Sequence, residues 1–104
     1  MQTVQQLVER ASKTEHGFKD LEAAAVEVCN MTPAIEAKEL ALTLLRVDLP
    51  QARCIGIFIL GMMAAQDDGA LQALKEQAGR DSDWRVQVPY RLLRDRRGGA
   101  GRRG

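Results

Sequence analysis

The chain contains few aromatic residues and only two cysteines, and both shortages limit the kinds of protein it can be. Phe, Trp and Tyr make up 4% of the 104 residues, so the core must be built from Leu, Ala, Val, Ile and Met. Most of these side chains lose little conformational freedom in a helix, which favours an all-α chain. Two cysteines cannot form a disulfide framework, and no Cys and His residues have metal-site spacing. We expect no metal and no cofactor.

Long hydrophobic runs are also missing. The longest uncharged apolar run, Cys54 to Ala65, has 12 residues, whereas a membrane-spanning helix needs about 20. The first residues lack the basic segment and apolar run of a secretory signal. We therefore expect a cytoplasmic protein with no membrane contact. No strict alternation of polar and apolar residues persists, so no strand is predicted.

Charge is divided unevenly along the chain. Residues 1–79 hold 7 Lys and Arg against 11 Asp and Glu, a net charge of −4. Residues 80–104 hold 8 Arg against 3 Asp, a net charge of +5. An acidic body with a basic end can bind phosphate groups through that end, although such a charge block can also be a solvated tail.

Apolar residues recur at helical spacing in five segments, and a short sixth helix is predicted after them. The expected helices are Thr3–Ser12, Phe18–Asn30, Pro33–Val47, Pro50–Ala65, Ala70–Ala78 and a segment that opens at Trp84. Thr32 and Asp48 are the expected N-caps of the third and fourth helices, and Gly79 is expected to end the fifth. Pro89 is expected to interrupt the sixth.

The fourth helix is apolar nearly all round, which is typical of a helix covered on both sides. Arg53 is the one charge between Ala52 and Ala65, and we expect its head at the surface or on a carboxylate such as Asp48. Gly56 and Gly61 would allow a neighbouring backbone to approach closely.

Helices of this length with short capped turns favour a repeat array over a four-helix bundle. We predict an all-α fold, a short right-handed α-α superhelix of about five to six antiparallel helices. Its expected extent is residues 1–96, followed by a flexible Gly and Arg tail over residues 97–104. On the third helix, we expect Ile35 to face inward with Ala37, Leu40 and Leu44.

Part of the chain resembles the DNA alkylation repair family of HEAT-like helical-repeat proteins. The likeness is carried by Ala34–Ala41, Gln51–Gly61 and Asp81–Gln87, the last with the Asp, Trp, Arg and Val of a HEAT helix start. It covers about residues 32–87. The resemblance implies a curved superhelix with a concave basic groove that binds DNA, and in some members excises alkylated bases.

The sequence also departs from that family. The chain is less than half the expected length, and Val88 stands four residues after Trp84, where the glycosylases pair an aromatic residue with an Asp. The residues after Gln87 do not continue a HEAT helix. We interpret them as an altered C-terminus, through a frameshift or a truncation.

Five residues are candidates for nucleic-acid binding. They are Arg80, Trp84, Arg85, Arg91 and Arg94. Trp84 can pack against the preceding repeat or stack on a ligand. Arg85 can contact phosphate or pair with a nearby aspartate.

No residue is assigned a catalytic role. His16 lies in a polar turn without a nucleophile beside it, and Cys29 and Cys54 lie on apolar stripes, which favours buried, inert thiols. The leading hypothesis is a non-catalytic nucleic-acid-binding module with DNA as its partner. The alternatives are a scaffold that binds a protein or a second copy of itself, and a DNA glycosylase fragment.

Overall fold

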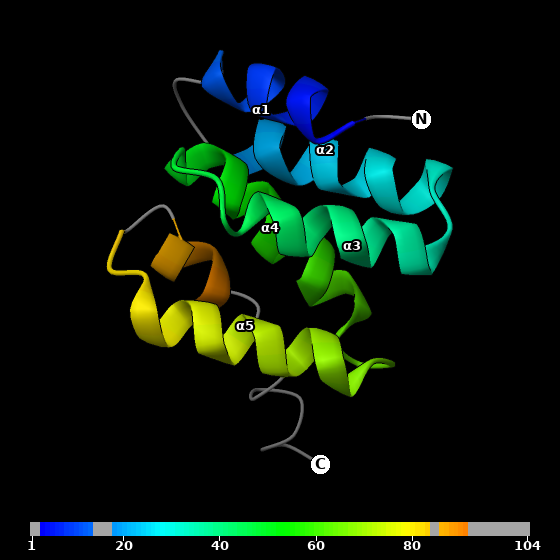
Figure 1. The fold of residues 1–104 in the computed structure, drawn as a ribbon, viewed down its shortest axis with the longest axis vertical. Helices are drawn as coiled ribbons and strands as arrows, with labels where there is room; N and C mark the ends of the chain where they lie inside the picture. The colour runs from blue at the N-terminus through cyan, green and yellow to red at the C-terminus, as the bar shows by residue number, and fades with distance from the viewer. Residues whose placement is uncertain (1–2, 14–17, 84–85, 92–104) are drawn as a thin grey trace.

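The computed structural model describes residues 3–13, 18–83 and 86–91, and within these ranges the chain forms helices and connecting turns without a strand (Figure 1). The helices are α1 (Val4–Ser12), α2 (Phe18–Met31), α3 (Ala34–Leu44), α4 (Pro50–Met63) and α5 (Asp68–Arg80), followed by a helical segment over residues 86–91. The predicted all-α fold class is confirmed. The predicted tail over residues 97–104 lies outside the described residues.

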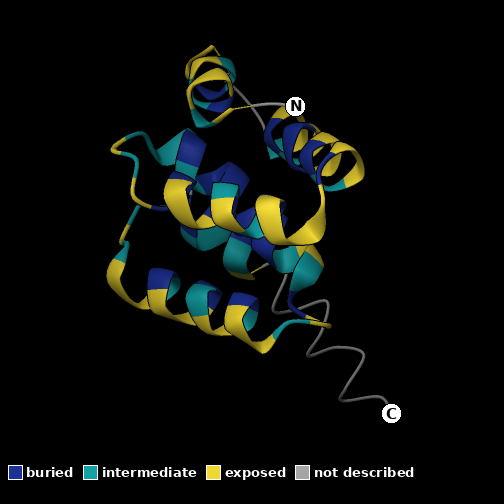
Figure 2. Cartoon of the chain, turned by 45° about the vertical axis from the view of Figure 1, so that its right-hand side comes forward, coloured by how far each residue is buried: buried dark blue, intermediate teal, exposed yellow. Residues whose placement is uncertain are grey.

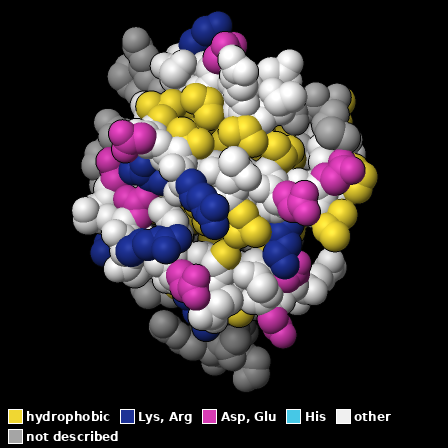
Figure 3. Space-filling model, in the orientation of Figure 1, with side chains coloured by type: hydrophobic (Ala, Val, Ile, Leu, Met, Phe, Trp, Pro, Cys, Tyr) yellow, Lys and Arg dark blue, Asp and Glu magenta, His cyan; other side chains and the backbone are white. Residues whose placement is uncertain are grey.

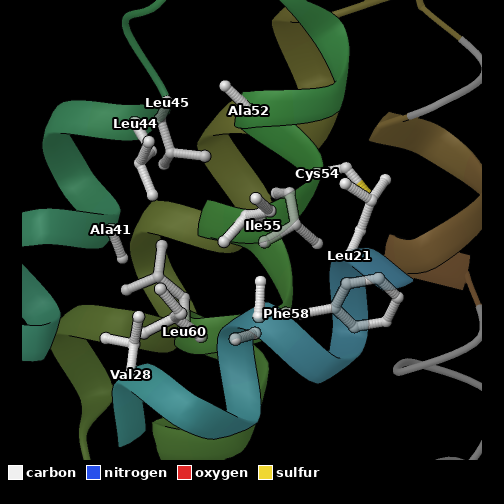
Figure 4. Packing of buried hydrophobic residues seen from close by; sticks show 14 of the residues in the cluster. Leu21, Val28, Ala41, Leu44, Leu45, Ala52, Cys54, Ile55, Phe58 and Leu60 are labelled. Atoms are coloured by element: carbon white, nitrogen blue, oxygen red, sulfur yellow. The ribbon is translucent and has the colours of Figure 1, made fainter. Parts of the chain in front are cut away.

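α4 forms the centre of the molecule, as its sequence predicts. It contacts α1, α2, α3 and α5, and α3 and α2 contribute the most extensive of these interfaces. Its middle, residues 54–60, is buried throughout (Figure 2). Figure 4 shows Leu21 and Val28 of α2 and Leu44 of α3 around the α4 side chains Ile55, Phe58 and Leu60.

Gly56 allows α3 and α4 to approach closely. A methyl group added at Gly56 would lie 2.9 Å from the carbonyl oxygen of Ala41 and 3.1 Å from Cδ2 of Leu45. Both distances are shorter than ordinary carbon contacts. The predicted close approach of a neighbouring backbone is confirmed at this glycine.

Two helices begin after a residue whose side chain caps the first turn. Thr3 caps α1 in a capping box, where its hydroxyl accepts from the Gln6 N–H and the Gln6 amide oxygen accepts from the Thr3 N–H. Asp67 caps α5 by accepting from the Ala70 N–H at 3.2 Å.

The predicted caps of α3 and α4 are wrong. α3 begins at Ala34 after Pro33, which has no side chain that can cap, and Thr32 is buried instead. α4 begins at Pro50 after Leu49, while Asp48 is exposed. In both places proline fixes the backbone dihedral at the helix start and has no N–H that needs a partner.

Three further expectations fail. Gly79 does not end α5, which continues to Arg80. Ile35 points outward with 72% of its surface exposed, whereas Ala37, Ala41 and Leu44 form the buried face of α3. Residues 86–91 are helical through Pro89, so this proline does not interrupt them.

α1 also departs from a simple pairing of consecutive helices. Its packing contacts within the described residues are mainly with α4 and α3. An ion pair between Arg10 and Glu27 links it to α2. None of the described helices combines the length and hydropathy needed to cross a lipid bilayer.

Candidate functional site

A shallow groove lies between the C-terminal half of α5 and the helical segment 86–91. Its volume is about 500 Å³. Lys75, Ala78 and Gly79 of α5 line one side, and Gln87, Tyr90 and Arg91 line the other. We call these six residues the basic groove.

The groove is open because α5 presents small residues to it. Ala78 and Gly79 follow one another on this side of the helix, and a methyl group added at Gly79 would meet no atom within 4 Å. A larger residue at either position would occupy the space. Small residues at consecutive positions therefore form the floor between Lys75 and the facing segment.

Segment 86–91 is held against α5 by hydrogen bonds and by burial. The Gln87 side-chain amide donates to the Ala78 carbonyl oxygen at 2.5 Å and also to the Asp81 carbonyl oxygen. Val86 is fully buried, and Pro89 is among the largest fully buried side chains. These contacts fix the position of Tyr90 and Arg91 relative to Lys75.

The charge of the basic groove is uncompensated by its lining. Among the described residues, no Asp or Glu lines the groove, and neither Lys75 nor Arg91 forms an ion pair. Three other cations do form such pairs: Arg10 with Glu27, Lys38 with Asp67, and Arg53 with Asp81. Lys75 and Arg91 are thus available to an anionic ligand.

A second hollow, of about 590 Å³, lies on the other side of α5. Arg46, Arg53 and Arg80 line it together with Asp48 and Asp81, so its charge is mixed. Arg80 is exposed and donates to the side-chain oxygen of Gln77 at 3.2 Å. Its guanidinium therefore lies at the edge of α5, outside the basic groove.

Arg53 binds a different carboxylate from the expected one. Its Nε donates to Asp81 at 2.6 Å, and its Nη1 donates to the Val47 carbonyl oxygen at 2.8 Å. The expectation of a carboxylate partner is confirmed, but the carboxylate is that of Asp81 and not that of Asp48. Asp81 follows α5 directly and is far from Arg53 in sequence, so only the packing of α4 against α5 brings the two together.

Asp81 is the centre of a hydrogen-bond network at the end of α5. Burial by itself would raise the pKa of its carboxyl group, but hydrogen bonds from the Asp83 N–H, the Gln77 amide and Arg53 outweigh burial and lower the pKa below its usual value. Asp81 is therefore charged at neutral pH. The network joins α4, α5 and the turn that leads to segment 86–91.

Two of the five predicted binding residues, Arg80 and Arg91, are exposed in the structure, on different sides of α5. The other three, Trp84, Arg85 and Arg94, lie outside the described residues, as does His16. Lys75 and Tyr90 were not predicted. Lys75 lies four residues before Gly79, and Tyr90 lies three residues after Gln87, so each pair shares one helix face. This spacing indicates a binding site only when α5 and segment 86–91 are known to pack together.

The cysteines behave as apolar residues. Cys54 is fully buried, and burial raises the pKa of its thiol to about 12. Burial also raises the pKa of Cys29. Neither thiol is a nucleophile at neutral pH. Among the described residues, no three His, Cys, Asp or Glu side chains form a group that could hold a metal ion.

The rest of the surface carries both signs of charge. On the face in Figure 3, Lys and Arg side chains alternate with Asp and Glu, and a band of hydrophobic side chains crosses the upper part.

The chain matches no family model, no curated protein and no solved structure.

Proposed function

We propose that this chain is a non-catalytic nucleic-acid-binding module that uses the basic groove to hold the phosphate backbone. The observation that carries the proposal is the pair Lys75 and Arg91, which line one groove without an acidic neighbour in its lining. Nonspecific nucleic-acid binding depends mainly on such cations, because each phosphate contact releases condensed counterions.

Positive charge is concentrated toward the C-terminal end of the sequence, to which the groove residue Arg91 belongs. Arg80 is exposed at the end of α5, and the Arg-rich residues beyond 91 follow Arg91 directly in the sequence. α2 and α3 each carry more Asp and Glu than Lys and Arg and would repel a strand, which favours the groove as the binding site.

We further propose that the chain is a short HEAT-like superhelix related to DNA alkylation repair proteins. The enclosed α4 and its long interfaces with α2 and α3 support stacking of successive helices into one array. The proposal also rests on the sequence likeness across residues 32–87. Base excision is the weakest of the hypotheses, since Val88 replaces the acidic partner of Trp84.

Binding of labelled DNA, measured by fluorescence anisotropy at low salt, tests the nucleic-acid proposal. We expect the double variant K75A/R91A to weaken binding by about fivefold or more, because two phosphate contacts are lost. The matched control K13A/K19A removes the same charge from the residue after α1 and from α2, and it should change affinity by less than about twofold. Equal losses in both variants, or no binding by the original chain, would contradict the proposal.

Self-association is the second candidate function, and exposed apolar residues favour it. Met31 and Ile35 expose 69% and 72% of their surfaces at the α2–α3 turn. Pairing with a second copy would remove these side chains from water. Light scattering should then show a dimer at high concentration that I35E converts to a monomer, with thermal stability unchanged because Ile35 is outside the core. A monomer at every concentration would exclude this function.

A further inference from the structure

We propose that the basic groove selects single-stranded nucleic acid, with one base stacked on the ring of Tyr90 while Lys75 and Arg91 contact the flanking phosphates. This inference rests on the proposed function and names its substrate class. The groove combines an aromatic ring with two unpaired cations, and this combination is typical of single-strand sites. Bases in a duplex are already stacked on one another and present no free face to such a ring.

The position of Tyr90 favours this role. Its ring is partly buried against the core and also lines the groove, so the side chain is held in place and still accessible. Val86 and Pro89, which precede Tyr90 on the same segment, are fully buried and anchor the backbone that leads to it. A ring that is fixed before binding loses little conformational freedom when a base stacks on it.

The residues beside Tyr90 form the floor of the groove, but they offer no free amide donor that would distinguish one base from another. Ala78 and Gly79 leave room above α5. The Gln87 amide nitrogen already donates to two backbone carbonyl oxygens, at Ala78 and Asp81, so its donor capacity is used within the protein. Recognition should therefore be tolerant of base sequence, because every base has an aromatic face.

The same groove is too small and too weakly charged to track a duplex. It holds two cations in a volume of about 500 Å³, which suits one or two nucleotides. DNA and RNA single strands should bind alike, because the proposed contacts are with a base face and with phosphates, which both have. The neighbouring hollow carries both signs of charge, so α5 offers a duplex no second basic surface continuous with the groove.

Anisotropy titrations with labelled dT20, U20 and a mixed-sequence 20-base-pair duplex test this inference. We expect dT20 and U20 to bind with similar affinity, at least about fivefold more tightly than the duplex. Y90L should weaken single-strand binding by about tenfold, as for loss of one stacked base, and weaken duplex binding far less, because a duplex presents no free base face to the ring. Y90F should bind as the original chain does, because it keeps the ring.

The outcomes separate this inference from the proposed function. If the duplex binds as tightly as dT20 and Y90L affects both alike, the single-strand inference is wrong while nucleic-acid binding stands. If no probe binds at low salt, the proposed function itself fails. Leu keeps the apolar contact with the core, and unfolding curves of Y90L and Y90F verify that both variants fold. If Y90L does not fold, a competition experiment with the original chain decides the question. An unlabelled duplex that displaces labelled dT20 as well as unlabelled dT20 does would overturn the single-strand inference.

Discussion

At the scale of single residues, two glycines in neighbouring helices have opposite roles. Gly56 lies against the backbone of α3, with no space for a methyl group, whereas Gly79 lies over open space in α5. Both are within helices, where glycine costs roughly 1 kcal/mol relative to alanine. The difference between them is therefore a difference in packing alone.

We predict that G56A destabilises the protein and that G79A stabilises it. A methyl group at Gly56 forces α3 and α4 apart, which should lower the free energy of unfolding by about 1–2 kcal/mol even after the gain in helix propensity. G79A should raise it by about 0.5–1 kcal/mol, since nothing opposes the added methyl group. Thermal unfolding of both variants provides the measurement, and a stabilised G56A would contradict the close packing.

The ion pair between Arg53 and Asp81 gives a second residue-scale prediction. Its side chains are only 15% and 10% exposed, so removal of one partner leaves the other poorly solvated. We expect D81N and R53M each to cost about 2 kcal/mol, and the double variant to cost less than the sum of the two. Strictly additive losses in chemical denaturation would show that the pair contributes no coupling.

This pair also has a defined pH dependence. The folded-state pKa of Asp81 is lowered, so its contribution to stability is fully present above the usual carboxyl pKa of 3.8 and is lost as pH falls through the folded value. The stability difference between the original chain and D81N should be constant from neutral pH to about pH 4 and shrink below it. A difference that shrinks at higher pH would mean that Asp81 is not stabilised in its charged form.

At the scale of helices, the sequence pattern predicted which segments are helical better than it predicted how they begin. The buried residues Leu7 and Ala11 of α1 and Leu74 of α5 belong to apolar stripes that follow directly from helical spacing within each segment. The starts of α3 and α4 depend on proline backbone geometry, which competes with the side-chain caps that Thr32 and Asp48 offered. The local sequence pattern could not decide whether proline geometry or a side-chain cap fixes the first residue of each helix.

Ile35 shows the limit of the same reasoning on α3. This helix carries apolar residues around much of its circumference, so spacing alone allows more than one inner face. The small residues Ala37 and Ala41 form the buried face because they let α4 approach, as the contact at Gly56 requires. Ile35 lies about half a helical turn away from Ala37 and Leu44 around α3, so it faces water.

At the scale of the whole molecule, the central position of α4 was predictable and the candidate site was not. An all-round apolar helix has to be covered on every side, and α1, α2, α3 and α5 cover α4. The basic groove depends instead on how segment 86–91 packs on α5, which no residue pattern specifies. Arg91 was identified by its charge, whereas Lys75 and Tyr90 became candidates only through their position in space.

The central claim, that the basic groove binds phosphates, predicts a particular dependence of affinity on salt. The logarithm of the association constant for dT20 should fall linearly with the logarithm of salt concentration, with about 0.7 of slope for each phosphate neutralised. K75A/R91A should reduce that slope by about 0.7 for each cation removed, and K13A/K19A should not change it. An unchanged slope in K75A/R91A, or an affinity independent of salt in the original chain, would contradict the claim.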